Sequence, residues 1–205
     1  VAPPAHRLDS EISAFLDWFN DDANTDPVLK AGLAHLWFVT IHPFDDGNGR
    51  IARAIADMAL ARSERSVQRF YSMSAQIRLE RNVYYETLEA AQKGAMDVTG
   101  WQEWFLGCLV RAIAGAEDTL ASVLFKSRFW TRFATEPLNQ RQIKVLNRLL
   151  DGFEGKLTSS KWAKLAKCSQ DTAYRDILDL IKRGALTKNP EGGRGTSYDL
   201  ADVRG

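Results

Sequence analysis

The 205-residue sequence predicts a mainly α-helical protein with a helical domain over residues 1–136 and a smaller domain over residues 137–205. Two observations carry this expectation. Apolar residues recur at helical spacing along most of the chain, and an alternating strand pattern is lacking before residue 185. The joint is expected at Glu136 and Pro137, because a residue that precedes proline disfavours helix.

Five helices are expected in the first domain. Three are marked by apolar residues that repeat every three or four positions, and two more are expected over residues 79–94 and 100–125. The residues of the three apolar faces are Ile12, Phe15, Leu16 and Phe19; Leu29, Leu33, Leu36 and Trp37; and Ile51, Ile55, Met58 and Ala59.

The second domain is expected to contain three short helices followed by a β-hairpin. The first helix covers residues 139–150, residues 158–160 can cap a second, and Ser169 can cap a third that ends before Gly184. Residues 185–188 and 196–200 are expected to form the hairpin strands. This order is that of a winged helix-turn-helix domain. The inward residues are expected to be Ile143, Leu146 and Leu149 on the first helix and Ile177, Leu178 and Ile181 on the third.

Charge is unevenly distributed along the chain. The totals of 27 basic and 26 acidic residues argue against a polyelectrolyte partner for the whole chain. Residues 1–136 hold 14 Lys/Arg and 18 Asp/Glu, whereas residues 137–205 hold 13 and 8. The basic excess therefore lies in the second domain.

Cys108 and Cys168 both fall in apolar helical stretches, which favours buried thiols in a reducing compartment over a disulfide. No apolar run approaches the roughly 18 residues of a membrane span, and no signal peptide opens the chain. We therefore expect a cytoplasmic protein with no membrane partner. Since the chain starts at Val1 without an initiator methionine, we expect it to be part of a longer protein.

Residues 42–53 combine the features of an anion-binding loop. Gly47 and Gly49 allow the backbone to approach a ligand closely. A helix expected to start around Asn48 to Ile51 presents free N–H groups and the positive end of its dipole. Arg50 and Arg53 lie one turn apart and offer two guanidinium groups suited to phosphates.

The same loop offers a metal ligand and a base. Asp46 supplies a carboxylate for a magnesium ion that bridges phosphates. His42 ends the preceding helix, and histidine is the side chain that titrates closest to neutral pH, which suits a general base. A nucleoside triphosphate with its metal, facing a proton acceptor, fits this set of residues. Each residue alone also fits an ordinary turn or cap between helices.

Residues 42–53 resemble the Fic-family motif His-x-Phe-x-Asp/Glu-Gly-Asn-Gly-Arg-x-x-Arg at every determined position. Residues 84–88 and 97–105 resemble the segment that follows this loop in bacterial Fic proteins, and residues 1–4 resemble the stretch that leaves the family's target-docking hairpin. A C-terminal winged helix is similar to a known appendage of the family. The resemblance implies a Fic-type helical bundle followed by a winged helix-turn-helix domain.

The resemblance implies a protein adenylyltransferase that uses ATP and Mg²⁺. His42 would deprotonate a Ser, Thr or Tyr hydroxyl of a target protein, whose oxygen attacks the α-phosphorus of ATP and releases pyrophosphate. Asp46 would hold Mg²⁺ on the α- and β-phosphates. Asn48, with the backbone of Gly47 and Gly49, would cradle the phosphates.

Four further roles follow from the resemblance. Arg50 and Arg53 would bind the β- and γ-phosphates, and Phe44 would anchor the loop in the core. Tyr84 or Tyr85 would pack near the adenine, although their spacing suits an ordinary helix face equally well.

Related chemistries differ in the loop. Doc-type kinases of the same superfamily carry Asn-Ala in place of Asp-Gly and a lysine in place of a glycine. This chain keeps Asp46, Gly47 and Gly49, which favours AMP transfer over phosphate transfer. Transfer of another nucleotide and removal of AMP stay open as alternatives.

Many Fic proteins are inhibited by a helix with the pattern Ser/Thr-x-x-x-Glu-Gly/Asn, whose glutamate pairs with the second motif arginine, here Arg53. The one match runs from Thr187 to Glu191 and Gly192. It contains Pro190 and falls in the expected hairpin turn, so we interpret it as turn chemistry. The inhibitory helix and most of the docking hairpin are expected upstream of the chain.

A second functional class is a DNA-binding regulator with a Fic switch domain. The outward residues of its recognition helix and wing would be Gln170, Asp171, Thr172, Arg175 and Lys182, with Lys188 and Arg194. Polar residues suit base edges and basic residues suit phosphates, but a protein-docking face has the same composition. The partner through this domain, DNA or protein, is therefore left open, as is a homodimer.

Overall fold

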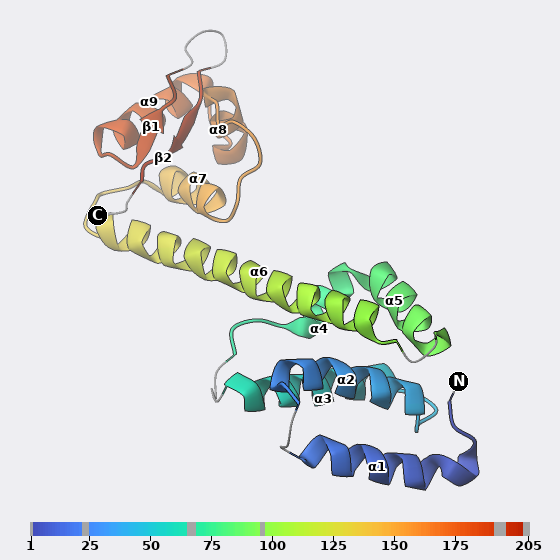
Figure 1. The fold of residues 1–205 in the computed structure, drawn as a ribbon. Helices are drawn as coiled ribbons and strands as arrows, with labels where there is room; N and C mark the ends of the chain where they lie inside the picture. Colours follow the sequence, from blue (N-terminus) through green and yellow to red (C-terminus); the bar gives the residue numbers. More distant parts are fainter. Residues whose placement is uncertain (1, 22–24, 65–68, 95–96, 191–195, 203–205) are drawn as a thin grey trace. The chain divides into compact units, whose positions relative to one another are not determined.

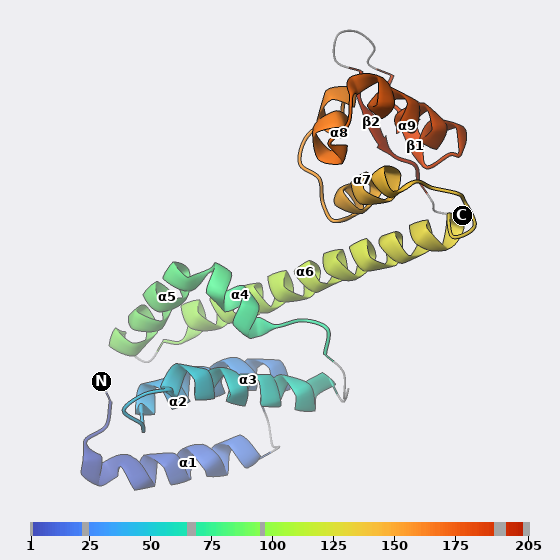
Figure 2. The same ribbon diagram turned by 180° about the vertical axis from the view of Figure 1, so that it is seen from behind.

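The computed structural model describes residues 2–21, 25–64, 69–94, 97–190 and 196–202, and it is mainly helical, as predicted (Figures 1 and 2). The chain forms two compact units that divide between Asp118 and Thr119. This division lies inside helix α6 (Thr99–Arg132), ahead of the joint expected at Glu136 and Pro137, and the assignment of functional domains stays a prediction. Within the described ranges, no helix has the length and apolarity needed to cross a membrane.

The first unit consists of helices. They are η1 (Ala5–Arg7), α1 (Leu8–Asn20), α2 (Pro27–Ile41), α3 (Asn48–Glu64), α4 (Met73–Leu79), α5 (Arg81–Lys93) and the first part of α6 (Thr99–Arg132). Both views show α2 and α3 side by side (Figures 1 and 2). The helix expected over residues 79–94 is α5, and the one expected over 100–125 extends to Arg132 as α6. The short α4 was not predicted, because seven residues are too few to establish a helical period.

The start of helix α2 is fixed by a side-chain cap and a proline. The Asp26 carboxylate accepts the backbone N–H groups of Val28 and Leu29 at 2.9 and 3.1 Å, and Pro27 occupies the first helical position, where an N–H group is not needed. The helix ends at His42, whose backbone is left-handed. Both ends of the helix that leads into the loop are thus fixed by the sequence.

Small side chains occupy buried positions on both α2 and α3. Ala31 and Ala34 of α2 and Ala52 and Ala56 of α3 are all almost completely buried, so the two helices can approach closely. Aromatic rings complete the core, and the Trp101 indole N–H donates to the carbonyl oxygen of Gly32 at 2.8 Å. The largest buried rings of this unit are Phe15, Trp101 and Phe105.

Three residues that were placed on the expected apolar faces are partly exposed instead. Leu16, Leu29 and Met58 are between 38% and 47% exposed.

The second unit follows the predicted element order. It holds the end of α6, then α7 (Gln140–Leu150), α8 (Ser159–Ala166), α9 (Gln170–Lys182), β1 (Leu186–Lys188) and β2 (Tyr198–Leu200), and the two strands pair antiparallel with Leu186 opposite Leu200. Thr158 and Ser169 cap α8 and α9 through their hydroxyl groups, as expected.

One inward residue of α9 was predicted wrongly. Leu178 is 45% exposed, whereas Ile177 is fully buried. The buried stripe runs through Ala173, Ile177 and Leu180, and Leu178 lies about 100° around the helix from Ile177 because an α-helix has about 3.6 residues per turn.

A buried carboxylate joins α7 to α9. The side chain of Asp176 accepts hydrogen bonds from the Arg141 guanidinium at 2.9 and 3.1 Å and from the Asn139 amide at 3.0 Å. Gln142, also buried, donates to the carbonyl oxygen of Asp176 and to the carboxylate of Asp179. These bonds satisfy the polar atoms at the helix interface and fix the orientation of α9 on α7.

The end of α9 provides a test of the local structure. Gly184 has a φ of +73°, its N–H donates to Ile181, and the N–H of Ala185 donates to Leu180 at 2.8 Å, which is a Schellman motif. A β-carbon at Gly184 would meet no atom within 4 Å. The Gly184→Ala substitution is therefore expected to lower the free energy of unfolding by about 1 kcal/mol through backbone strain alone.

The matched control is Gly115→Ala, inside α6, where a β-carbon also meets nothing within 4 Å and the backbone is helical. It is expected to raise the free energy of unfolding by up to about 1 kcal/mol. Urea titrations followed by circular dichroism measure both effects. Shifts of the same sign in the two variants would contradict a left-handed cap at Gly184.

Candidate active site

The histidine of the loop occupies an uncommon backbone conformation. His42 has φ 53° and ψ 55°, and its N–H donates to the carbonyl oxygen of Phe38 at 3.2 Å. Left-handed residues other than glycine are rare, and histidine is among those enriched there. The conformation ends α2 and leaves the His42 side chain exposed at the surface. A group that must meet a large substrate needs this exposure.

Asn48 closes the loop. Its side chain is 3% exposed, its amide oxygen accepts the N–H of Phe44 at 3.1 Å, and its amide nitrogen donates to the carbonyl oxygen of Phe44 at 2.5 Å. Both halves of the amide are therefore used to hold the backbone. The predicted role of Asn48 in cradling phosphates stays a prediction.

The anchoring role predicted for Phe44 is wrong for its side chain. Phe44 is 52% exposed, and the centroid of its ring lies 6.5 Å from that of the buried Phe38. The loop is held instead by the two backbone hydrogen bonds to Asn48, which provide an anchor without burying a ring.

The start of α3 has the backbone features that favour an anion. Gly47 has a φ of +89°, and its carbonyl oxygen accepts the N–H groups of Arg50 and Ile51 at 2.9 and 3.0 Å. The first N–H groups of a helix, here those of Asn48 and Gly49, have no partner inside it. Together with the helix dipole they favour a negatively charged ligand at this point.

Asp46 and Arg50 form an exposed ion pair. Their side chains are 2.8 Å apart, with 90% and 71% of the side-chain surface exposed. Such a pair contributes about 0–1 kcal/mol, so either partner can exchange it for a ligand. In the described part of the chain, no group of three or more His, Cys, Asp or Glu residues could hold a metal. A single carboxylate fits Mg²⁺ that arrives with phosphates, because this ion commonly keeps one or two protein carboxylates.

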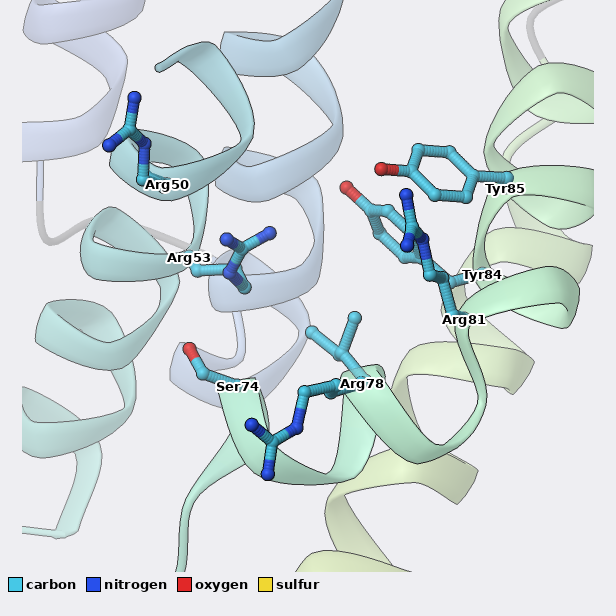
Figure 3. Close-up of a pocket in the computed structure, with 8 residues that line it drawn as sticks. Arg50, Arg53, Ser74, Arg78, Arg81, Tyr84 and Tyr85 are labelled. Atoms are coloured by element: carbon cyan, nitrogen blue, oxygen red, sulfur yellow. The ribbon is translucent and has the colours of Figure 1, made fainter.

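A pocket of about 470 Å³ lies beside the loop. Helix α3 contributes residues from one side, and α4 and α5 contribute them from the other (Figure 3). The predicted residues Arg50, Arg53, Tyr84 and Tyr85 are all brought together here. The complete lining is Arg50, Arg53, Ser74, Ile77, Arg78, Arg81, Tyr84 and Tyr85.

The two tyrosines differ in their surroundings. Tyr84 is 3% exposed, and its hydroxyl lies 3.1 Å from Nε2 of His35; burial raises its pKa, while the charge of Arg53 opposes this shift. Tyr85 is 53% exposed, with its ring centroid 5.0 Å from that of Tyr84. Tyr84 thus belongs to the wall of the pocket, and Tyr85 is the ring available to a ligand.

His35 was not identified from the sequence. It is fully buried in α2 among the rings of Tyr84, Trp101 and Phe105. Burial, and secondarily the charge of Arg53, lowers its pKa to about 3, so this imidazole is neutral at physiological pH. A neutral ring at this depth positions the Tyr84 hydroxyl. A single histidine in an apolar helix gives no pattern from which this role could be predicted.

Ser74, Arg78 and Arg81 were also missed. Arg78, Arg81 and Tyr85 follow one another at intervals of three and four residues, the spacing of one helix face. That spacing was the only available signal, and the break between α4 and α5 at Glu80 obscured it.

Known proteins share both the loop and the fold. Residues 1–60, which include the loop, match the model of the Fic/DOC family. A protein adenylyltransferase Fic from Nematostella vectensis is 33% identical over 117 residues, covering 55% of this chain and 25% of that protein. Protein adenylyltransferase fic-1 from Caenorhabditis briggsae is 40% identical over 55 residues, covering 26% of this chain and 11% of that protein. The chain therefore spans a quarter or less of the length of these relatives.

The fold also matches a solved structure. The crystal structure of a Fic family protein from Desulfovibrio desulfuricans G20 superposes with a TM-score of 0.53 at 24% identity, covering 98% of this chain and 57% of that chain. At this identity the likeness concerns the fold, and it extends over both units.

The buried His35 predicts a pH dependence of stability. Because its pKa falls from 6.5 to about 3 on folding, the unfolded chain binds a proton between these values that the native protein does not. The free energy of unfolding is therefore expected to fall as pH drops through this window, by up to about 1.4 kcal/mol per pH unit. Urea titrations between about pH 7 and about pH 4.5, which cross the pKa of 6.5 that histidine has in the unfolded chain, measure the slope.

His35→Gln removes this proton linkage and retains an amide for the Tyr84 hydroxyl, so its slope is expected to be shallower than that of the wild type. His6→Gln, at an exposed position in η1, is the matched control and should leave the slope unchanged. If the free energy of unfolding changed with pH by the same amount in the wild type and in His35→Gln, this would refute a neutral buried imidazole.

Proposed function

We propose that this chain transfers AMP from ATP to a Ser, Thr or Tyr hydroxyl of a target protein and releases pyrophosphate. One observation carries the proposal. A single closed loop joins an exposed histidine, His42, to a helix start from which Arg50 and Arg53 line a pocket. The names of the relatives, protein adenylyltransferases, support the same reaction.

In the proposed step, the His42 imidazole takes the proton of the target hydroxyl. The hydroxyl oxygen then forms a bond to the α-phosphorus of ATP, and the bond from that phosphorus to the oxygen bridging the α- and β-phosphates breaks. AMP stays on the target, and pyrophosphate leaves. His42 suits this role because its side chain is exposed while its backbone is fixed at the end of α2.

The remaining residues bind and orient the nucleotide. The N–H groups at the start of α3 face the phosphates, and Arg50 and Arg53 offer forked donors for the β- and γ-phosphates. Asp46 is the residue that would hold Mg²⁺, which neutralises phosphate charge when bound. For this, Asp46 exchanges its weak pairing with Arg50, which frees that guanidinium for the nucleotide as well.

His42→Ala is expected to lower AMP transfer by about 100-fold or more, because general bases contribute about 10²–10⁴ to rate. ATP affinity should be unchanged, since His42 contacts the incoming hydroxyl and not the phosphates. Labelled ATP with Mg²⁺ and host lysate measures transfer, and calorimetry measures binding. His6→Ala is the control at an exposed histidine. Wild-type rates for His42→Ala at saturating ATP would exclude His42 as the base.

We propose that the second unit is a winged helix-turn-helix domain whose α9 contacts duplex DNA. The exposed polar and basic residues Gln170, Arg175, Lys182 and Lys188 favour DNA. A hollow of about 500 Å³ lies beside the start of α9 and includes Lys164 and Lys167 in its lining. Arg194 and the residues Glu191 and Gly192 of the inhibitory-pattern match lie outside the described residues.

Two exposed apolar residues on α9 favour a protein partner instead. Tyr174 and Leu178 are 50% and 45% exposed and lie one turn apart, and Asp171 adds an exposed negative charge at the start of the helix. Such a surface suits docking to a protein. The dependence of binding affinity on salt concentration distinguishes the two partners.

If α9 binds DNA, affinity for random duplexes is expected to fall steeply with salt, because each phosphate contact by Lys or Arg releases counterions. Fluorescence anisotropy between about 50 and 200 mM salt, the range over which such contacts change affinity greatly, measures this slope. Arg175→Gln should reduce it, whereas Lys30→Gln, in the first unit, should not. An absence of binding at the lowest salt would favour the protein-docking alternative.

A further inference from the structure

The pocket beside the loop holds twice as much positive charge as the loop motif accounts for. Arg50 and Arg53 come from α3, and Arg78 and Arg81 come from α4 and α5 (Figure 3). Its eight lining residues include no carboxylate. Arg50 pairs with Asp46, while the described residues provide no ion-pair partner for the other three guanidiniums.

The carboxylate nearest in sequence to the added arginines is already engaged. Glu80 lies between α4 and α5, and its two oxygens accept hydrogen bonds from the Arg111 guanidinium at 2.6 Å each. The hydrogen bonds from Arg111 are also the main cause that holds the pKa of Glu80 below its usual value. Because Glu80 is committed to Arg111, it does not neutralise Arg78 or Arg81.

The two added arginines are exposed and suited to a ligand. Arg78 and Arg81 both lie at the surface of the pocket, and Ser74, one turn before Arg78, adds an exposed hydroxyl. The Arg81 guanidinium lies 5.7 Å from the ring centroid of Tyr85, a cation–π contact that limits its orientations. Guanidinium groups that face a shared cavity without counterions repel one another, and a polyanion relieves this repulsion.

We propose that Arg78 and Arg81 form a second phosphate-binding wall, opposite Arg53, that makes the pocket selective for the outer phosphates of a nucleotide. The inference rests on the proposed function in one respect, that the ligand is a nucleotide. Arg53 holds the outer phosphates from α3, and Arg78 and Arg81 hold them from α4 and α5. A nucleoside triphosphate engages both walls, whereas a monophosphate lacks the groups that reach the second wall.

The test compares MgATP with AMP by calorimetry on the 205-residue chain. The double variant Arg78→Gln/Arg81→Gln is expected to weaken MgATP binding by about 10-fold to 100-fold, since each charge-assisted contact is worth about a factor of ten. AMP affinity should change by less than about 2-fold, within ordinary scatter for exposed substitutions. The preference for ATP over AMP therefore falls.

Two further variants separate the effect of the guanidinium geometry from that of positive charge. Arg78→Lys/Arg81→Lys keeps the charge and removes the forked geometry, so its loss should be intermediate. Arg148→Gln, at an exposed position in α7, removes one positive charge that does not line the pocket and should leave both affinities unchanged.

The outcomes separate this inference from the proposed reaction. Equal weakening of ATP and AMP, unchanged affinity for both, or no nucleotide binding by the wild-type chain would overturn the second phosphate wall. AMP transfer by the wild type together with an unaltered nucleotide preference in the double variant would overturn the wall alone. A lost preference in the double variant, without any transfer by the wild type, would support the wall and refute the reaction.

Discussion

The close packing of α2 against α3 is the constraint on which the loop depends. Helices α2 and α3 are in extensive contact, and Ala31, Ala34, Ala52 and Ala56 lie almost completely buried in the core that they share; the distance between packed helices follows the size of the side chains between them. Since α2 ends at Ile41 and α3 begins at Asn48, the chain must turn within residues 42–47. A larger residue at any of the four alanines would overpack the core that holds these helices together and so disturb the turn that joins them.

The residues of that turn and of the helix start after it have two different functions in the structure. Gly47 supplies a backbone conformation with positive φ, and Asn48 holds the backbone of Phe44 through its amide oxygen and one amide N–H group. His42 has an exposed side chain, and Arg53 lines the pocket. The motif therefore combines residues that fix the backbone of the turn with residues whose side chains are accessible to a ligand.

Local chemistry explains which parts of the fold could be predicted. The start of α9 at Ser169 and its end before Gly184 were predicted to the residue, because a capping hydroxyl and a left-handed glycine are encoded locally. Helix α4 was missed because it is shorter than the pattern that identifies helices. Phe44 was misjudged because a role carried over from a family resemblance does not reveal that its backbone, held by the Asn48 amide, anchors the loop while its ring stays exposed. Arg78 was missed because its pocket exists only after α3, α4 and α5 meet.

The pocket also shows why net charge is a poor guide to the ligand of a site. Residues 1–136 carry more acidic than basic residues, yet arginines from three helices line one cavity without a carboxylate. The acidic side chains nearby are engaged elsewhere: Glu80 with Arg111, and Asp57 with Arg69. Salt screens exposed charges beyond about 8 Å at physiological ionic strength, so distant carboxylates do not cancel the field inside the cavity. Recognition of a polyanion is therefore decided by which few charges share the pocket, and a domain with an acidic excess can bind a nucleotide through it.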